Sequence, residues 1–368
     1  MGKVLILGGY GNFGKRIAEA LVRSGVPIII AGRNEGKAQS LATDLRQRHS
    51  KAEIAAIAVD AERHLTAILQ TLRPAIVINT CGPFQLKRYD VAEACIAAHV
   101  HYVDLADGRG FVTGITSLDA KAKAAGMWVI SGASTVPGLS SAVLEHFKHE
   151  FSTIESLRFG ISPGQKAERG LATTQGILTY VGKKLAPVAG DAKPRYGWQN
   201  IYRQDYPELG ARWMANCDIP DLDLFPIRYG IKQIQFSAGM ENTLVHFGIW
   251  ALGWAVRLGL PLELPKHAAF LLRASHWFDR FGSADGGMHV IIRGGDKEGK
   301  PHEQRWFIIA LNGDGPQIPC VPAIVLARKL ASGTLPGAGA TPCIGMVTLE
   351  EYLIELESFA VTVFSNSS

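Results

Sequence analysis

The chain has 368 residues, of which 47% are hydrophobic, so it is long enough and apolar enough to bury the cores of two domains. Its net charge of +5 arises from 38 basic and 33 acidic residues, which are mixed along the whole length without a polybasic run. This balance speaks against a nucleic-acid partner and suits a small anionic ligand.

The cysteines and the N-terminus predict a cytoplasmic protein. The five cysteines are odd in number, widely spaced and never arranged as C-x-x-C, which argues against a disulfide framework and a cysteine-based zinc site. The chain begins directly with a strand-like segment, and no charged region followed by an apolar region and a cleavage site precedes it. We therefore expect no secretory signal and a reducing environment.

Residues 3–131 alternate between strand-like and helix-like patterns. Six short runs are rich in β-branched residues: KVLIL, PIIIAG, EIAAIAVD, AIVINT, HYVDLA and MWVISG. The segments between them carry apolar residues spaced three to four apart, as amphipathic helices do. Because near-continuous apolar strands are typical of parallel sheets covered on both faces, the pattern predicts an α/β, Rossmann-like doubly wound parallel sheet.

The first strand-like run ends in the glycine-rich stretch GGYGNFG, residues 8–14, which an amphipathic segment follows. A strand, a glycine turn and a helix place unpaired backbone N–H groups and the positive end of the helix dipole where a pyrophosphate can bind. The glycines fit G-x-G-x-x-G from Gly9 or G-x-x-G-x-x-G from Gly8. A purely structural tight turn is the alternative. The candidate cofactor-binding residues here are Gly8, Gly9, Gly11, Asn12, Phe13 and Gly14.

The end of the second strand indicates which dinucleotide binds. An acidic residue at this position would hold the ribose 2′-hydroxyl of NAD, but the sequence IIIAGRNEGK has Arg33 there, followed by Asn34. A guanidinium can bind a 2′-phosphate, so the sequence predicts NADP as the cofactor. Glu35 lies close enough to weaken this argument, and a solvated Arg33 is the alternative. Asp60, after the third strand, could contact the adenine or cap the next helix.

The fourth strand ends in INTCGPF, residues 78–84. Loops at the carboxyl ends of the strands line the ligand crevice of a doubly wound sheet. We therefore expect Cys81, Gly82 and Pro83 to pass the cofactor on the way to its nicotinamide. For Cys81, a small packing residue is favoured over a nucleophile.

Near residues 132–147 the alternation stops, which predicts a second, α+β domain. It is expected to contain a strand at STIESLRFGIS, a helix at GLATTQGILTYVGKKL, apolar helices near 243–258 and 265–281, and a hairpin over 287–313. No regular structure is assigned to most of residues 187–230. A helix near 320–332 follows, and TLEEYLIEL carries a capping pattern, Thr348 with Glu351.

Residues 244–262 are the most membrane-like stretch of the chain. His246 and Arg257 interrupt it and Pro261 ends it, so its apolar core is shorter than the roughly 20 residues that a bilayer span requires. A buried or interface helix is one interpretation, and a homodimer would use such an interface. Peripheral contact with a membrane surface through 244–262 is the other.

Several of these segments together resemble the saccharopine dehydrogenase/reductase-like family, specifically its NADP-binding domain. The segments are GGYGNFG, AGRN, NTCGPF, VAEACIAAHVHYVDLAD and AKAAGMWVISGASTVPGLSS. The tail GTLPGAGATPCIGMVTLEEYLIEL is also similar to that family's tail, which returns to the first domain. The resemblance implies an NADP-binding Rossmann domain over 1–138, an inserted substrate or dimerisation domain over 139–334, and a returning segment over 335–368.

The resemblance also implies an NADP-dependent oxidoreductase that transfers hydride at an imine or amine centre of a small molecule. Such chemistry needs a group that protonates or deprotonates nitrogen, and Tyr102, Asp104 and Asp107 are the nearest candidates by position. Each could instead be structural. No carboxylate clamp is recognisable in the middle domain, whose aromatic and apolar helices suggest a larger or more hydrophobic substrate. A non-catalytic NADP-binding sensor or scaffold, and a carbonyl or enoyl reductase, remain alternatives.

Other motifs carry less weight. GISPG places Ser162 in a hydrolase pattern, but Pro163 lacks the N–H that the oxyanion hole would use. Tyr180 and Lys184 have the spacing of a short-chain dehydrogenase pair, although the partner serine is absent. The pairs His99/His101 and His146/His149 have no companion ligands, so no metal is expected. Arg169, Thr173 and Thr174 could form an anion site at a helix N-terminus, or simply cap it.

Overall fold

The chain folds into two compact units in a computed structural model that describes residues 2–61, 63, 65–85, 87–188 and 190–368. The first unit comprises Met1–Ala142 and Gln317–Glu355, and the second comprises Val143–Pro316 and Leu356–Ser368. Each unit is built around a seven-stranded sheet.

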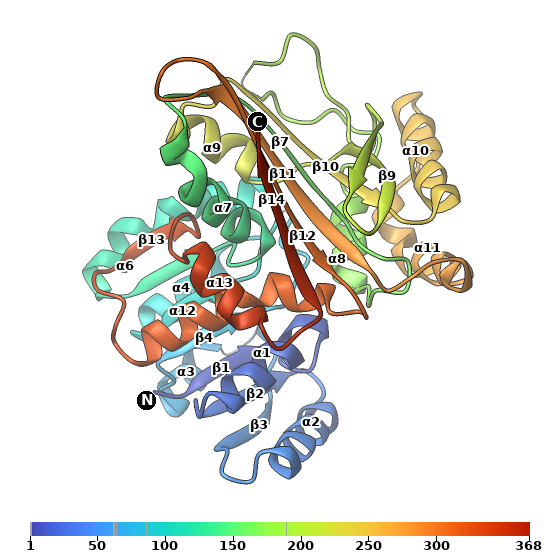
Figure 1. The fold of residues 1–368 in the computed structure, drawn as a ribbon. Helices are drawn as coiled ribbons and strands as arrows, with labels where there is room; N and C mark the ends of the chain where they lie inside the picture. The colour runs from blue at the N-terminus through green and yellow to red at the C-terminus, as the bar shows by residue number, and fades with distance from the viewer. Residues whose placement is uncertain (1, 62, 64, 86, 189) are drawn as a thin grey trace. The chain divides into compact units, whose positions relative to one another are not determined.

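The first unit contains a wholly parallel sheet with the strand order β13-β6-β5-β4-β1-β2-β3 (Figure 1). Its strands are β1 (Val4–Leu7), β2 (Ile28–Gly32), β3 (Ile54–Ala58), β4 (Ile76–Asn79), β5 (His101–Asp104), β6 (Trp128–Ser131) and β13 (Gly339–Pro342). The six strands expected from the N-terminal sequence are all present, and the order of β1 to β6 is that of a doubly wound dinucleotide-binding sheet. The predicted fold class is therefore confirmed.

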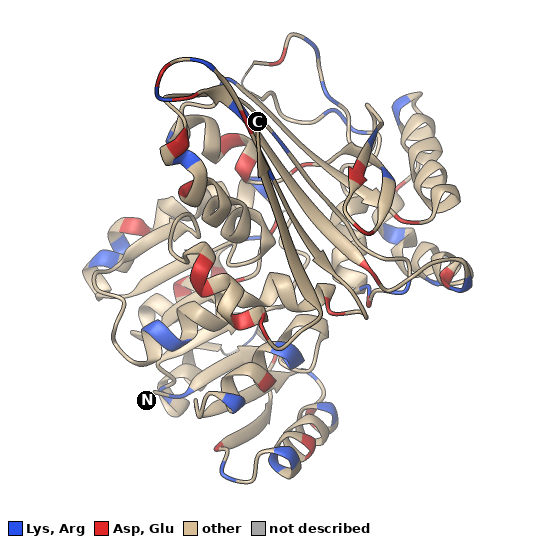
Figure 2. Cartoon of the chain, in the orientation of Figure 1, with Lys and Arg blue, Asp and Glu red and all other residues tan. Residues whose placement is uncertain are grey.

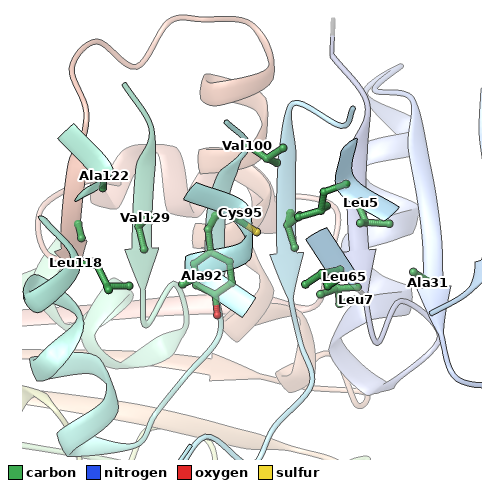
Figure 3. Close-up of a cluster of buried hydrophobic side chains, with 14 of the residues drawn as sticks. Leu5, Leu7, Ala31, Leu65, Ala92, Cys95, Val100, Leu118, Ala122 and Val129 are labelled. Carbon is green, nitrogen blue, oxygen red and sulfur yellow. The ribbon is translucent and has the colours of Figure 1, made fainter. Parts of the chain in front are cut away.

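Helices cover both faces of this sheet. They are α1 (Asn12–Arg23), α2 (Glu35–Arg48), α3 (Leu65–Leu72), α4 (Asp90–Ala97), α5 (Arg109–Gly114), α6 (Asp119–Ala125), α12 (Val321–Ala331) and α13 (Leu349–Leu356). On one face, Leu5, Val77 and Val129 of the strands pack against α3, α4 and α6. Figure 3 shows Leu5 and Val129 in this cluster. Helix α12 contacts α1, β4 and β5. Burial from both sides explains why these strands are apolar at successive positions.

The second unit contains a mixed sheet with the order β14-β12-β11-β7-β10-β9-β8. Its strands are β7 (Thr153–Ser162), β8 (Tyr202–Tyr206), β9 (Gly210–Asn216), β10 (Gln233–Met240), β11 (Gly286–Gly295), β12 (Pro301–Ala310) and β14 (Val361–Ser367). Its helices are α7 (Ser140–Phe147), which begins in the first unit, α8 (Leu171–Leu178), α9 (Asp221–Tyr229), α10 (Thr243–Arg257) and α11 (Ala268–His276). Strands β7 and β10 pair in parallel and the other neighbours are antiparallel.

The hairpin expected over 287–313 is formed by β11 and β12, and the two predicted apolar helices correspond to α10 and α11. The segment 187–230, which has no clear pattern in the sequence, contains β8, β9 and α9. Helix α8 ends at Leu178, earlier than expected. No helix in the described part of the chain has both the length and the hydropathy that a membrane crossing needs.

The C-terminal part of the chain is divided between the two units, whereas the sequence analysis assigned 335–368 to the first domain and 320–332 to the second. Helix α12 lies in the first unit, where eight of its residues are buried. Strand β13 pairs with β6, and α13 begins with the predicted capping box, in which the Glu351 N–H donates to Thr348 Oγ1 over 3.1 Å. Strand β14 then pairs with β12 in the second sheet. The chain thus contributes a final strand to each sheet.

Candidate cofactor site

The carboxyl ends of β1 and β4 mark the point where the chain order of the first sheet reverses. These two strands are neighbours, while β2 lies on the far side of β1 and β5 on the far side of β4. In open parallel sheets the crevice for a ligand lies outside the carboxyl ends at this position. Two loops line it here: the glycine turn after β1 and the Thr80–Pro83 loop after β4.

The glycine turn is packed so closely that its first and last glycines have no room for a side chain. Gly8 has φ +73°, and a Cβ on it would lie 2.5 Å from Thr80 Oγ1. A Cβ on Gly14 would lie 2.3 Å from the Gly8 carbonyl oxygen. The Gly9 N–H donates to the Ala31 carbonyl over 3.0 Å, and the Gly11 N–H donates to the Gly8 carbonyl over 2.8 Å. Helix α1 therefore starts close against the end of β1.

The N-terminus of α1 is available to an anion. Its N-cap is Gly11, which supplies no side-chain hydrogen bond to the first turn. Asn12 and Phe13 form the start of the helix, and the Arg16 guanidinium donates to the Asn12 carbonyl over 2.6 Å. Arg16, which the sequence analysis did not select, places a positive charge one turn into the same helix. The first-turn N–H groups of a helix and its dipole both favour a phosphate at such a position.

Arg33 and Asn34 follow β2, and both are exposed. Asn34 is the N-cap of α2, and its Oδ1 accepts from the Lys37 N–H over 3.0 Å. The Tyr10 ring lies over Gly32: a Cβ on Gly32 would be 2.5 Å from Tyr10 Cε1. The Tyr10 hydroxyl also accepts from the Asn34 N–H over 2.9 Å. The sequence analysis did not select Tyr10, because its position depends on two loops meeting in space.

Asp60 lies just beyond the carboxyl end of β3 and is exposed. Its carbonyl accepts from the Arg63 N–H over 3.0 Å. Helix α3 starts only at Leu65, so Asp60 does not cap it, and that alternative is wrong. The position of Asp60, next to the end of β2 in the sheet, remains consistent with an adenine contact.

The loop after β4 is tied to the glycine turn. Thr80 Oγ1 donates to the Leu7 carbonyl over 2.8 Å, which joins the ends of β4 and β1. The Cys81 N–H donates to Asn79 Oδ1 over 3.0 Å, and the following Gly82–Pro83 peptide is cis. Cys81 is exposed, so the expectation that it is a packing residue is wrong. The loop thus lies beside the glycine turn at the edge of the sheet where a cofactor would bind.

Tyr102 and Asp104 lie in the buried core of the first unit. Asn79 Nδ2 donates to the Tyr102 hydroxyl over 3.2 Å, and burial raises the pKa of Tyr102 well above its usual value. Asp104 Oδ1 accepts from the Ala106 N–H, the Ser131 hydroxyl and the Gly132 N–H over 3.0, 2.9 and 2.8 Å. Burial raises the pKa of Asp104 to about 6. This carboxyl group connects the loops that follow β5 and β6.

Asp107 is the most accessible of the three candidate catalytic residues. It lies three residues beyond β5 and is partly exposed. Its Oδ1 accepts from Gln85 Nε2 over 3.0 Å, so the loop after β5 is connected to the loop after β4. Burial raises the pKa of Asp107 above its ordinary value. A carboxyl group of raised pKa at the edge of a crevice is suited to proton transfer.

The remaining motifs form no site of their own. Arg169 Nη2 is paired with Asp279 Oδ1 at 2.5 Å, so its charge is neutralised rather than offered to an anion. Tyr180 lies beyond the end of α8, and it does not share a helix with Lys184. Ser162 is fully buried. No three histidine, cysteine or acidic side chains in the described residues come together as metal ligands.

Comparison with known proteins agrees with this geometry. Residues 4–130 match the model of the family described as saccharopine dehydrogenase NADP binding domain. No curated protein matches the sequence.

Among solved structures, the apo histidine-tagged saccharopine dehydrogenase (L-Glu forming) from Saccharomyces cerevisiae has a TM-score of 0.66 at 12% identity over 100% of both chains. A short-chain dehydrogenase from Sphingobium yanoikuyae in complex with NADPH has a TM-score of 0.29 at 17% identity over 36% of this chain and 70% of that one. The first similarity extends the agreement in fold to the whole chain. The family match confirms NADP as the predicted cofactor.

Proposed function

We propose, from the premise that residues 4–130 are an NADP-binding domain of the saccharopine dehydrogenase type, that this chain is an NADP-dependent oxidoreductase acting on an imine or amine carbon. The observation that carries the proposal is the turn between β1 and α1. There, the carbonyl oxygen of Gly8 lies where a Cβ on Gly14 would be, so strand and helix approach as closely as a dinucleotide fold requires.

The described residues fit the parts of the cofactor. The backbone of Gly9, Gly11, Asn12 and Phe13 and the start of α1 would hold the pyrophosphate. Arg33 would receive the 2′-phosphate, because its exposed guanidinium has planar donors, and the exposed Asn34 next to it in the chain would border that group.

The two loops further along the sheet would serve the other parts of the cofactor. Asp60 would contact the adenine, and Cys81, Gly82 and Pro83 would border the nicotinamide. Bound NADPH supplies a hydride, and NADP accepts one.

Asp107 is the proposed proton donor and acceptor. When a hydride adds to the carbon of a C=N bond, the nitrogen must gain a proton, and in the reverse direction it must lose one. The raised pKa of Asp107 keeps it protonated to a higher pH than an exposed aspartate. Gln85 orients the carboxyl group through its hydrogen bond to Oδ1. Tyr102 and Asp104 are proposed as positioning residues that hold the loops around it.

The cofactor part is tested by titrating the protein with NADPH and with NADH. Arg33→Ala is expected to weaken NADPH binding by about tenfold or more, since a charged hydrogen-bonded pair is lost, and to change NADH binding little. Lys297→Ala, an exposed cation in the turn between β11 and β12, is the matched control and should change neither. Equal losses for both nucleotides, or no loss for either, would contradict the role of Arg33.

The reaction is tested by following NADPH oxidation with a panel of amino acids paired with keto acids, and with apolar carbonyl and enoyl compounds. Turnover with an amine and a keto acid together supports C–N chemistry, and Asp107→Asn should then lower kcat while leaving NADPH affinity unchanged. Turnover with a carbonyl or enoyl compound alone would redirect the proposal to that reductase class. Tight NADPH binding without turnover across the panel would favour the sensor or scaffold.

A further inference from the structure

Most of the large apolar side chains that are exposed in the described residues lie in one segment of the second unit. In the described part of the chain, ten large hydrophobic residues are exposed, and seven of them lie between residues 244 and 281. We call these seven the apolar surface: Leu244, Leu258, Leu260, Leu262, Phe270, Trp277 and Phe281. A concentration of exposed large apolar side chains in one segment is a feature of interaction sites.

Helix α10 shows how little of this region is used for packing. Only His246 and Gly253 of its fifteen residues are buried, although the sequence TLVHFGIWALGWAVR is mostly apolar. Gly253 is the point of closest packing, because a Cβ on Gly182 would lie 2.2 Å from its carbonyl oxygen. At about 1.5 Å per residue α10 is about 22 Å long, which is shorter than the roughly 30 Å of a bilayer core. Its apolar side chains therefore suit a surface contact.

The charges in the same segment are mainly positive. Residues 243–281 contain four basic residues, Arg257, Lys266, Arg273 and Arg280, and two acidic residues, Glu263 and Asp279. Both acids are already paired, Glu263 with Lys266 and Asp279 with Arg169 and His276. Figure 2 accordingly shows α10 uncharged over most of its length, with a basic group at one end.

Two of the remaining three arginines are placed beside aromatic rings. Arg257 lies 4.6 Å from the centroid of the Trp254 ring, and Arg280 lies 4.6 Å from that of Phe281. Neither they nor Arg273 form an ion pair with any of the described residues. Guanidinium groups held at the edge of an apolar surface can reach lipid phosphates while the rings enter the acyl boundary.

We propose that the apolar surface docks peripherally on a lipid bilayer that carries anionic headgroups. A second copy of the chain is the competing occupant, but a two-fold contact would place two copies of the same surface, each with the excess positive charge of Arg257, Arg273 and Arg280, against each other. Anionic headgroups instead supply the opposite charge to these side chains. Leucine, tryptophan and phenylalanine interspersed with arginine are the composition of interfacial helices.

The test measures co-sedimentation of the full chain with phosphatidylcholine vesicles that contain or lack phosphatidylglycerol. The wild type is expected to bind the anionic vesicles, with a blue shift in tryptophan fluorescence. The double variant Trp277→Ser/Phe281→Ser should bind at least about tenfold more weakly, because these side chains are 78% and 64% exposed and contribute to docking rather than to the core. Ile227→Ser, at a residue of α9 that is 87% exposed, is the matched control and should bind like the wild type.

Charge and self-association are tested separately. Arg273→Glu/Arg280→Glu should also lower binding to anionic vesicles, and so should added salt, because the headgroup attraction is electrostatic. The proposal is overturned if the wild type does not bind anionic vesicles, or if both double variants bind as the wild type does. A wild-type dimer that becomes monomeric in Trp277→Ser/Phe281→Ser, without vesicle binding, would show that the surface is an interface between copies.

Discussion

The two sheets of the molecule bury their strands in different ways. In the first unit every residue of β1, β2 and β4 is buried, so these strands are continuous apolar runs between layers of helices. In the second unit β7 mixes exposed and buried positions, and β8 alternates between half-buried and exposed positions up to the buried Tyr206. A sheet covered on both faces has only its carboxyl edge open to a ligand, and the candidate cofactor site lies there. The second sheet is not covered in this way, and the apolar surface of the second unit lies outside the sheet, on α10, α11 and the segments next to them.

The same contrast appears in the buried ionisable groups. Asp104 in the first unit accepts three hydrogen bonds from the loops that border the crevice. His289 in the second unit lies inside the protein, with its Nδ1 2.8 Å from the Tyr206 hydroxyl. Burial raises the pKa of Asp104 to about 6, and burial together with Arg158 lowers the pKa of His289 to about 3. Burial thus favours the neutral form of each group. A fall in pH therefore stabilises the folded state through Asp104 and destabilises it through His289.

The largest expected difference between the two units is in the effect on NADPH binding of adding one methyl group to each. Gly14→Ala places a Cβ 2.3 Å from the Gly8 carbonyl oxygen and 2.8 Å from the Gly9 Cα, both backbone atoms that cannot rotate away. NADPH binding should be abolished or reduced at least about a hundredfold, because the turn must open to admit the methyl group. Titration of NADPH fluorescence measures this loss.

Gly248→Ala in α10 is the matched control for that substitution. A Cβ at Gly248 meets nothing within 4 Å, so the change should leave NADPH binding intact and stabilise the protein by about 0.5–1 kcal/mol. If Gly14→Ala keeps full NADPH affinity, the turn is not the pyrophosphate site.

The second prediction concerns how the free energy of unfolding falls at acid pH. His289 has a folded-state pKa far below its unfolded value, so the unfolded chain binds more protons between pH 3 and 6.5, and stability falls as the pH falls through this window. Between pH 6.5 and 4 this group alone should cost about 3 kcal/mol of the free energy of unfolding. His289→Gln removes the titration, and urea unfolding of both proteins across this range measures the difference. Parallel profiles for the two proteins would show that His289 is protonated in the folded state.

The parts of the fold and site that follow from local pattern could be predicted from the sequence. The glycine turn, the position of Arg33 and the six parallel strands all follow from strand runs and their neighbours in the chain. Positions that depend on distant segments could not. Tyr10 lies over Gly32 because two loops meet, and nothing in GGYGNFG indicates that contact. Likewise, β13 belongs to the first sheet because it pairs with β6, and β14 belongs to the second because it pairs with β12.

The burial of the predicted catalytic residues illustrates the same limit. Tyr102 and Asp104 were placed near the nitrogen chemistry because they stand at the end of the fifth strand. A strand that is covered on both faces gives no alternation that separates a core side chain from one facing the crevice. Asp107, three residues further along, lies in the loop, and loops at the carboxyl edge are where accessible groups are found.

The smallest expected effect, opposite in sign to that of His289, comes from Asp104. Its folded-state pKa is raised above the unfolded value of 3.8, so its contribution to stability is fully present below pH 3.8 and is lost as the pH rises through about 6. The wild type should lose about 2 kcal/mol of stability between pH 4 and 6 through this group, and the profile of Asp104→Asn should lack that loss because its side chain does not titrate. Asp104→Asn can keep an oxygen acceptor for the Gly132 N–H, so the variant should fold, and urea unfolding over this range is the measurement.

If the wild type instead gains stability relative to Asp104→Asn between pH 4 and 6, the carboxylate is favoured in the folded state. The hydrogen bonds from Ala106, Ser131 and Gly132 would then outweigh the cost of burying the charge, and the contrast between the two units would disappear.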